Sequence, residues 1–570
     1  MPPLEIVSAL ATCWLSPWML MDLLHKLPFH LRQIGLQVLA LVAFIGLKYL
    51  FDDNVGLVNE VDVLPLARQA ADPNWIPADW YLNQPPGYRR LFALLFGNLA
   101  SVSGFLATSI LGRLVCYSLV ALGLVLIGRR LGLKLPLLIT ALGLFLYVIP
   151  EQGVAAQEWL VKSLEAKAVA YGLLLLAIAC LLRQRYQLMA LLLGLATSFH
   201  VLVGGWATLI VVATLLLKAT RQGRPLNLRQ FGLGAVIYCA ASAFAITPVV
   251  AHLFSAPVAG KLAPSFIYVF LRLPHHLNPL SWKPFWWLIP LAYLIVLVAS
   301  IAVLGQEQRQ TRQQTQQQTQ QQYQASIDLF QLTLLSLVPF VAGLLLAPFD
   351  QQGNWLQFYP FRVGDVLLPL NTCLLLTCAV QYKFAARQQI VQWVCLGLIA
   401  ITCSIQLATF QTQVASLPQF PAHQDPALEP EFLELADWVK TQTPANALII
   451  SSPVELVELS WITERPTLAK YKLLPQTKTK ILEWYDRIAD LNGGVFPQAS
   501  SPRTQDVRSE TRRSLTEGYS RLTSEQAQAL LTKYSAQYLL TRANHQLTLP
   551  IAYRNDRYIL YRTHLTSLEE

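Results

Sequence analysis

The chain has 570 residues, of which 54% are hydrophobic and only 13% are charged, and its mean hydropathy is +0.41. Soluble globular proteins carry roughly 25% charged residues, so this composition excludes an ordinary soluble protein and indicates one that lies in a lipid bilayer. The formal net charge is +10, but the bases lie in short loops between apolar segments, which argues for membrane topology and against nucleic-acid binding.

In chain order, the apolar segments predict about eleven membrane-spanning helices, because a helix needs roughly 20 apolar residues to cross the hydrocarbon of a bilayer. They cover residues 33–51, 108–128, 134–150, 166–183, 187–200, 201–218, 231–253, 284–305, 328–347, 364–382 and 390–411. The fifth and sixth segments are short and meet at His200, so they could form one broken helix. Residues 1–412 are therefore expected to form an all-α polytopic transmembrane bundle.

The charges in the loops between these segments predict the orientation of the bundle. One set of loops holds most of the bases, and the alternate set holds most of the acids. Because basic loops stay in the cytoplasm during insertion, we expect a cytoplasmic N-terminus, acidic outer loops and a location in the plasma membrane. Within the first outer loop, residues 52–107, the part from 88 to 104 is expected to form an amphipathic helix on the membrane surface.

After residue 412 the composition changes to that of a soluble domain. Residues 413–430 form a proline-rich linker, and residues 431–570 alternate helical and strand patterns, which indicates a small extracytoplasmic α/β domain. None of the eight cysteines lies after residue 403 and none forms a Cys-x-x-Cys pair, so neither a disulfide in this domain nor a metal site is expected. Helices are expected at 431–441, 479–488 and 524–534, and strands at 447–452, 537–541 and 558–561.

The first outer loop carries four candidate catalytic carboxylates, Asp52, Asp53, Glu60 and Asp62. A carboxylate held at the membrane surface can act as a general base toward a hydroxyl or an amine. It can also hold a divalent cation, Mg²⁺ or Mn²⁺, against a phosphate. The alternative interpretation is a solvated acidic loop that only follows the charge rule for outer loops.

Basic and imidazole groups near the ends of spans form a second set of candidates. A charge at the membrane edge is unfavourable unless it is paired or used. Arg362 stands three residues before Asp365, so an ion pair within one helix competes with a role as a clamp on a lipid-linked phosphate. Lys167 is a similar candidate, with extension toward the membrane surface as the alternative. His200 is a candidate because it lies within the membrane, although a structural histidine explains it equally well.

Several stretches of the sequence accompany this layout of spans, acidic first loop and outer α/β domain. They are AKAVAYGLLLLAIACLL (166–182), LLGLATSFHVLVGGW (192–206), ALIISS (447–452) and EWYDR (483–487). Together they resemble the GT-C superfamily of membrane glycosyltransferases, which includes the oligosaccharyltransferase catalytic subunit, the protein O-mannosyltransferases and the bacterial aminoarabinose transferase. The sequence lacks a clear acceptor motif of the WWDxG type, which argues against peptide glycosylation of the oligosaccharyltransferase kind.

The resemblance implies transfer of a sugar, with inversion, from a polyprenyl-phosphate donor to an acceptor outside the membrane. It implies a catalytic carboxylate in the first outer loop, with Glu60 or Asp62 ahead of Asp53 and Asp52, and a donor-phosphate contact at Arg362. In that case Glu60 or Asp62 should face a cavity with Arg362 across it.

Two other functions stay open at this point. A transporter or flippase of lipid-linked glycans would need polar residues along a path through the spans, and few are present. A non-catalytic envelope assembly protein on the same fold would need neither a pore nor a reactive carboxylate.

Overall fold

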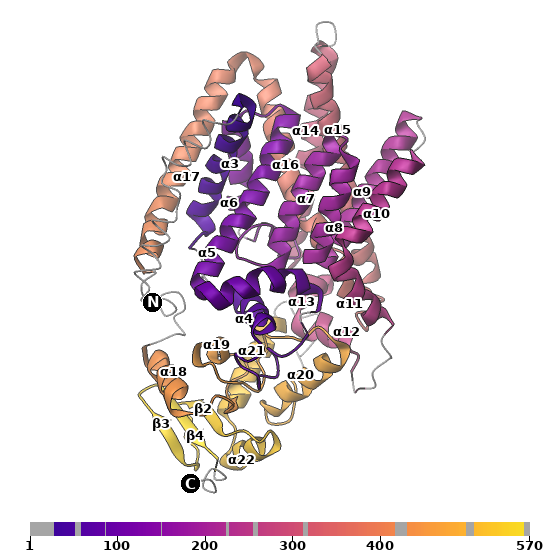
Figure 1. Ribbon diagram of the computed structural model, residues 1–570. Coiled ribbons are helices and arrows are strands. Elements are labelled where there is room, and N and C mark those ends of the chain that lie inside the picture. Colours follow the sequence, from indigo (N-terminus) through magenta and orange to yellow (C-terminus); the bar gives the residue numbers. More distant parts are fainter. Residues whose placement is uncertain are drawn as a thin grey trace.

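The structure is a computed structural model, which describes residues 28–51, 59–85, 87–149, 151–223, 227–254, 260, 262–311, 317–416, 430–497 and 507–563. Long helices form a bundle, and a smaller α/β domain at the C-terminus packs against one end of it (Figure 1). This confirms the predicted fold class. We call the end of the bundle beside the C-terminal domain the domain end, and the opposite end the far end.

The helices of the bundle coincide with the predicted spans. They are α3 (Phe29–Tyr49), α5 (Arg90–Leu131), α6 (Leu135–Tyr147), α7 (Ala166–Leu182), α8 (Tyr186–Phe199), α9 (Val201–Gln222), α10 (Leu228–Ala241), α11 (Ala243–Leu253), α14 (Leu288–Thr311), α15 (Gln317–Leu346), α16 (Arg362–Lys383) and α17 (Gln388–Ser416). By length and apolar composition, seven helices in the described residues could cross a membrane, or eight with the bent pair α10–α11. Helices α6, α7 and α8 are apolar but shorter. The number of eleven spans therefore stays a prediction.

Helix α7 forms the centre of the bundle. All of its residues are buried, as expected for a helix that is apolar on every side, and it packs against α5 and α8. Glycines permit the approach to α5: a Cβ atom on Gly172 would lie 2.6 Å from the Cβ of Leu119, and one on Gly123 would lie 2.6 Å from that of Leu175. The two backbones therefore lie closer together than larger residues would allow.

The outside of the bundle is apolar and exposed. On α17, for example, Trp393, Ile401 and Ile405 each expose more than half of their surface. A continuous apolar exterior around long helices is the surface expected against lipid, where water cannot compensate an exposed polar group. The protein is therefore integral to a membrane.

The domain end holds the irregular segments between the spans. Helix α4 (Glu60–Ala71) and the first part of α5 lie across the end of the bundle, next to the C-terminal domain (Figure 1). Gly104, with a φ of 75°, ends that first part and turns the chain into the span. The helix predicted at 88–104 is therefore present, and its position on the membrane surface stays a prediction. The other short elements are η1 (Gly87–Arg89), α12 (Pro264–Phe266), η2 (Ile267–Arg272, a π-helix), α13 (Pro274–Leu277), η3 (Pro279–Ser281), η4 (Pro284–Trp287) and η5 (Leu356–Phe358), while η6 (Ala385–Arg387) lies at the far end.

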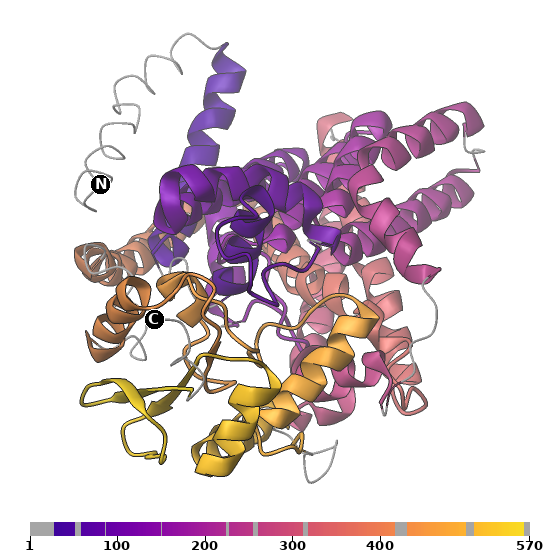
Figure 2. The same ribbon diagram turned by 60° about the horizontal axis from the view of Figure 1, so that its bottom comes forward.

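The C-terminal domain is built on a four-stranded sheet in the order β1-β2-β4-β3, and Figure 2 views it from the domain end. Strand β1 (Ile449–Ile450) pairs parallel to β2 (Tyr538–Arg542), and β4 (Tyr558–Arg562) pairs antiparallel to both β2 and β3 (Ile551–Arg554). The helices are α18 (Pro430–Gln442), α19 (Leu459–Thr463), α20 (Lys478–Asp490), α21 (Val507–Ser520) and α22 (Ser524–Lys533).

The predicted helices and strands of this domain are all present, while β3, α19 and α21 were not predicted. Helix α17 continues to Ser416, past the predicted boundary at 412, and residues 417–429 of the predicted linker lie outside the described residues.

The close contact between α5 and α7 gives a test of the packing. We expect Gly172→Leu to lower the free energy of unfolding of the purified protein by about 1–3 kcal/mol, because the new side chain must push α5 away. Gly397→Leu on α17 is the matched control, since a Cβ atom there meets nothing within 4 Å. Thermal unfolding in detergent measures both variants, and equal midpoints for the two would contradict this packing.

Candidate functional site

A cavity of about 650 Å³ lies at the domain end, between the bundle and the C-terminal domain. Segments that are far apart in the sequence meet around it: the first outer loop, the start of α7, the break between α8 and α9, the π-helix η2, the start of α16 and residues 472–481 of the C-terminal domain. The C-terminal domain thus supplies one wall of the cavity.

The charged lining of this cavity is mainly basic. Six bases line it, Arg89, Lys167, Arg272, Arg362, Lys472 and Lys478, against two acids, Asp62 and Glu165. A cleft with an excess of one sign of charge and partly apolar walls concentrates the opposite charge, so this cavity is suited to an anion. The predicted candidates Asp62, Lys167, His200 and Arg362 all line it.

Glu60 does not line the cavity. Its side chain is fully buried, and its Oε1 accepts hydrogen bonds from Nε of Arg113 at 2.8 Å and from the backbone N–H of Leu164 at 2.7 Å. Its Oε2 accepts one from Oγ of Ser109 at 2.6 Å. Of the two carboxylates expected to face a cavity, Glu60 does not, because its carboxylate is used in a buried ion pair that joins α4, α5 and the segment before α7.

Asp62 is the carboxylate of α4 that reaches the cavity, with 23% of its side chain exposed. Its Oδ2 accepts hydrogen bonds from both terminal nitrogens of Arg89 at 3.2 Å, and its Oδ1 accepts one from the hydroxyl of Tyr81. Burial, and then the negative charge of Asp62, raise the pKa of Tyr81 well above its usual value, so the hydroxyl remains a donor. The other predicted carboxylates, Asp52 and Asp53, lie outside the described residues.

Arg362 is not paired with Asp365 as the spacing in α16 suggested. Asp365 instead accepts hydrogen bonds from the backbone N–H groups of Ala155 at 2.7 Å, Ala156 at 2.9 Å and Glu158 at 3.1 Å. Arg362 pairs with Glu158, whose Oε1 lies 2.9 Å from Nε and 2.9 Å from Nη2. The interpretation as a pair within one helix is wrong, because both side chains find partners in the loop before α7.

Glu158 holds two of the cavity bases in place. Nζ of Lys167 lies 3.6 Å from Oε2 of Glu158. Burial raises the pKa of the Glu158 carboxyl, but the positive charges of Arg362 and Lys167 outweigh burial and lower this pKa to about 2. The guanidinium of Arg362 also lies 3.0 Å from Nε2 of His200 and 3.7 Å from the ring centre of Tyr359. Since a guanidinium has no acceptor, Nε2 of His200 accepts this hydrogen bond, so the histidine orients Arg362.

The sequence analysis did not single out several residues of this site as candidates, among them Glu158, Arg272 and Lys472. Nη2 of Arg272 donates to the backbone carbonyl of Lys472 at 2.9 Å, while its buried Nε has no hydrogen-bond partner among the described residues. Burial lowers the pKa of Lys472 to about 8, although Glu458 opposes the shift. The signal that could have found Arg272 is its position, since it is a base in a loop that the charge rule predicts to be outside. Lys472 gives no such signal, because the rule does not apply to a separate soluble domain.

The expectation of a divalent cation finds no ligand set in the described part of the chain. No group of three or more His, Cys, Asp or Glu side chains there is arranged to hold a metal ion. Asp62, the first-loop carboxylate at the cavity, is engaged by Tyr81 and Arg89. As arranged, the described residues do not fit Mg²⁺ or Mn²⁺.

Comparisons with known proteins match one family model and a number of solved structures. A family model described as "Domain of unknown function (DUF6798)" matches residues 430–491, and no curated protein matches the sequence. The fold is similar to that of crystal structures of ArnT from Cupriavidus metallidurans. The apo form matches with 12% identity and a TM-score of 0.44, covering 92% of this chain and 96% of that one. The form bound to undecaprenyl phosphate matches with 12% identity and a TM-score of 0.43, covering 93% and 97%.

The two carboxylates of α4 should differ sharply in their effect on stability. Glu60→Gln removes the charge opposite a buried Arg113, and we expect the free energy of unfolding to fall by about 3–5 kcal/mol. Asp62→Asn acts on a partly exposed pair, and its effect should stay within about 1 kcal/mol. Denaturant unfolding of the two purified variants measures the difference. A stable Glu60→Gln protein would show that the pair with Arg113 does not support the fold.

Proposed function

We propose that the protein is a membrane glycosyltransferase of the GT-C type, which transfers a sugar from a polyprenyl-phosphate donor to an acceptor outside the membrane. The observation that carries this proposal is the basic cavity at the domain end, with Asp62 and Glu165 in its lining. Its wall also includes apolar residues of α9 and α11, such as Val201 and Val249, which suit a prenyl chain beside a phosphate.

Asp62 is the general base in this proposal. The acceptor hydroxyl or amine attacks the anomeric carbon of the donor, the bond from that carbon to the phosphate oxygen breaks, and Asp62 takes the proton of the acceptor. Direct displacement of this kind inverts the configuration at the anomeric carbon. Arg89 holds Oδ2 of the Asp62 carboxylate from one side. Other lone pairs of this carboxylate are left to accept the proton of the acceptor. Asp62 replaces Glu60 in this role because it reaches the cavity.

The cavity bases receive the charge of the leaving phosphate. Arg362 and Lys167, the predicted phosphate contacts, are fixed by Glu158, which neutralises part of their charge. Arg272 and Lys472 add positive charge from the π-helix and the C-terminal domain. Fixed donors around a developing negative charge stabilise the transition state without reorganisation during the reaction.

We also propose that the protein lies in the plasma membrane, with the far end and the N-terminus in the cytoplasm and the C-terminal domain outside. The charges of the described residues support this orientation. The loops and helix ends at the far end contain the bases Arg129, Arg130, Lys134, Arg183, Arg185, Lys218, Arg221, Arg229, Lys383 and Arg387, against the acids Glu307 and Asp328.

The variant Asp62→Asn tests the catalytic role. We expect transfer from a polyprenyl-phosphate sugar, measured in proteoliposomes, to fall by a factor of about 10²–10⁴, because the amide cannot accept the proton. Binding of the donor should persist, since the cavity bases are unchanged. Asp72→Asn is the matched control in the same outer loop, because Asp72 ends α4 and does not line the cavity.

Full transfer activity in a folded Asp62→Asn protein would contradict the role of Asp62. Movement of the donor across the bilayer by the unmodified chain, without a new glycosidic bond, would favour a flippase instead. A chain that neither binds nor turns over the donor would favour an assembly protein.

The pKa of Lys472 predicts how binding of polyprenyl phosphate, the product that remains after sugar transfer, depends on pH. A lysine is charged below its pKa, so Lys472 loses its charge as the pH rises through about 8. The second pKa of a phosphate monoester is about 6, so the headgroup keeps its charge between pH 7 and 9. We expect the affinity for polyprenyl phosphate to decline over that range, and Lys472→Arg to abolish the decline because arginine stays protonated. Titration at several pH values measures it, and identical profiles for the two proteins would exclude Lys472 from the phosphate site.

A further inference from the structure

A second hollow of about 840 Å³ lies at the far end of the bundle, well away from the cavity described above. Helix α8 packs against both α9 and α10, and the hollow is a groove between these two helices with α8 as its floor. Helix α10 has no buried residue, so one wall of the groove is a helix that faces the lipid. The groove is therefore a space that lipid can enter from the side.

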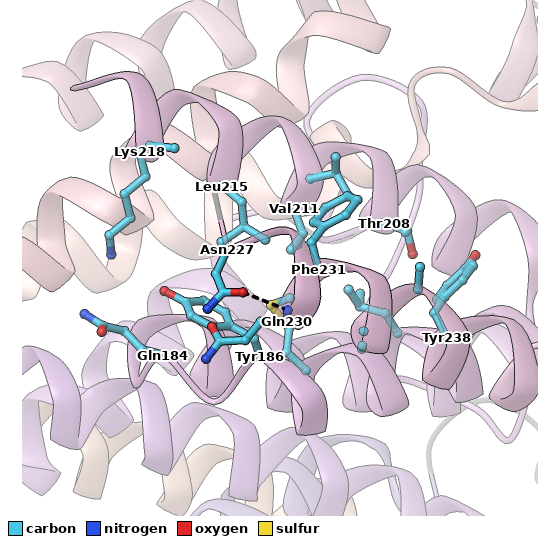
Figure 3. A pocket seen from close by; sticks show the side chains of 17 residues that line it. Gln184, Tyr186, Thr208, Val211, Leu215, Lys218, Asn227, Gln230, Phe231 and Tyr238 are labelled. Atoms are coloured by element: carbon cyan, nitrogen blue, oxygen red, sulfur yellow. Dashed lines mark hydrogen bonds between the residues drawn. The ribbon is translucent and has the colours of Figure 1, made fainter. Parts of the chain in front are cut away.

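The lining of the groove changes from polar to apolar along its length (Figure 3). One end collects polar side chains from the ends of the three helices: Gln184, Tyr186, Lys218, Asn227 and Gln230. Leu215 lies beside Asn227, Val211 and Phe231 lie further along, and Thr208 and Tyr238 lie at the other end. The apolar side chains of Met189 and Leu193 also line the groove. A polar mouth followed by an apolar channel matches an amphiphile whose head lies at the membrane surface.

The length of the groove matches one leaflet. From Asn227 at the mouth to Tyr238 at the inner end, α10 rises by about 16 Å. Half of the hydrocarbon of a bilayer is about 15 Å thick. A chain that follows the groove from the surface therefore ends near the middle of the membrane, as an acyl chain of a phospholipid does.

Three exposed bases stand next to or within a few residues of mouth residues in the sequence, although they do not line the groove itself. Arg185 precedes α8, Arg221 lies in the last turn of α9 and Arg229 in the first turn of α10, and all three are exposed. Within the described residues, none of the three has a carboxylate at ion-pair distance. Lys218 is different, since its Nζ lies 2.6 Å from Oδ2 of Asp328. The three arginines are therefore exposed charges at the ends of the helices that form the groove, and they are available to a headgroup at the membrane surface.

We propose that this groove is a binding site for an anionic glycerophospholipid of the leaflet at the far end, which is the cytoplasmic leaflet in the proposed orientation. The phosphate lies among Arg185, Arg221 and Arg229, beside Asn227 and Gln230, and one acyl chain follows the apolar part between α9 and α10. Basic pockets between membrane helices bind anionic headgroups in this way. The site does not depend on the sugar transfer proposed above.

The test is native mass spectrometry of the full-length purified protein with phosphatidylglycerol, phosphatidylcholine or polyprenyl phosphate added separately. The dissociation constant of phosphatidylglycerol should be lower than that of phosphatidylcholine by a factor of at least about ten. Binding of phosphatidylglycerol should drop by a similar factor in Ala235→Phe, which fills the groove. Val236→Phe is the matched control, because Val236 is 66% exposed on the same helix and does not line the groove.

A second pair of variants keeps the test independent of the bulky substitution. Arg221→Gln combined with Arg229→Gln should weaken phosphatidylglycerol binding, while Arg387→Gln, an exposed base at the same end of the bundle, should leave it unchanged. Equal binding of the two phospholipids, or no loss in either groove variant, would overturn the proposal. Polyprenyl phosphate binding more tightly than phosphatidylglycerol, with the same sensitivity to Ala235→Phe, would also overturn it.

Discussion

The arrangement at the domain end depends on how the loop between α6 and α7 satisfies its buried backbone. Irregular backbone at the edge of a membrane is tolerated only where its N–H and C=O groups find partners inside the protein. Asp365 accepts three N–H groups in the middle of this loop, and Glu60 accepts that of Leu164 near its end. Gln152, near the start of the loop, accepts the N–H groups of Leu160 and Val161. The buried carboxylates of Asp365 and Glu60 therefore hold the loop in place, whereas those of Asp62 and Glu165 line the cavity.

This fixed loop determines what the cavity contains. It carries Glu158, which orients Arg362 and Lys167, and it ends at Glu165, a carboxylate of the cavity wall. The opposite wall comes from the C-terminal domain, where Lys472 is joined to the π-helix through Arg272. A polar site that is held on both sides by buried hydrogen bonds is already arranged for its ligand, which lowers the cost of ordering it on binding. The domain is therefore part of the site.

Much of the fold could be predicted because it rests on local properties. Apolar length places the helices of the bundle, and periodicity places the helix at 88–104 and most of the C-terminal domain. The site could not be predicted in the same way. Glu60 and Asp62 stand two residues apart on one helix, which turns them to different sides, and the side that is buried is decided by Arg113, 53 residues away. Likewise, Arg272 and Lys472 meet across 200 residues.

The most direct test of the account is a cryo-electron microscopy structure of the full chain in lipid nanodiscs with polyprenyl phosphate. The account predicts that the phosphate lies in the cavity at the domain end, in contact with the bases that line it, and near Asp62. The prenyl chain should leave the cavity between α9 and α11. A phosphate bound at the far end, or an empty cavity at a saturating concentration of the lipid, would contradict the proposed donor site and with it the proposed reaction.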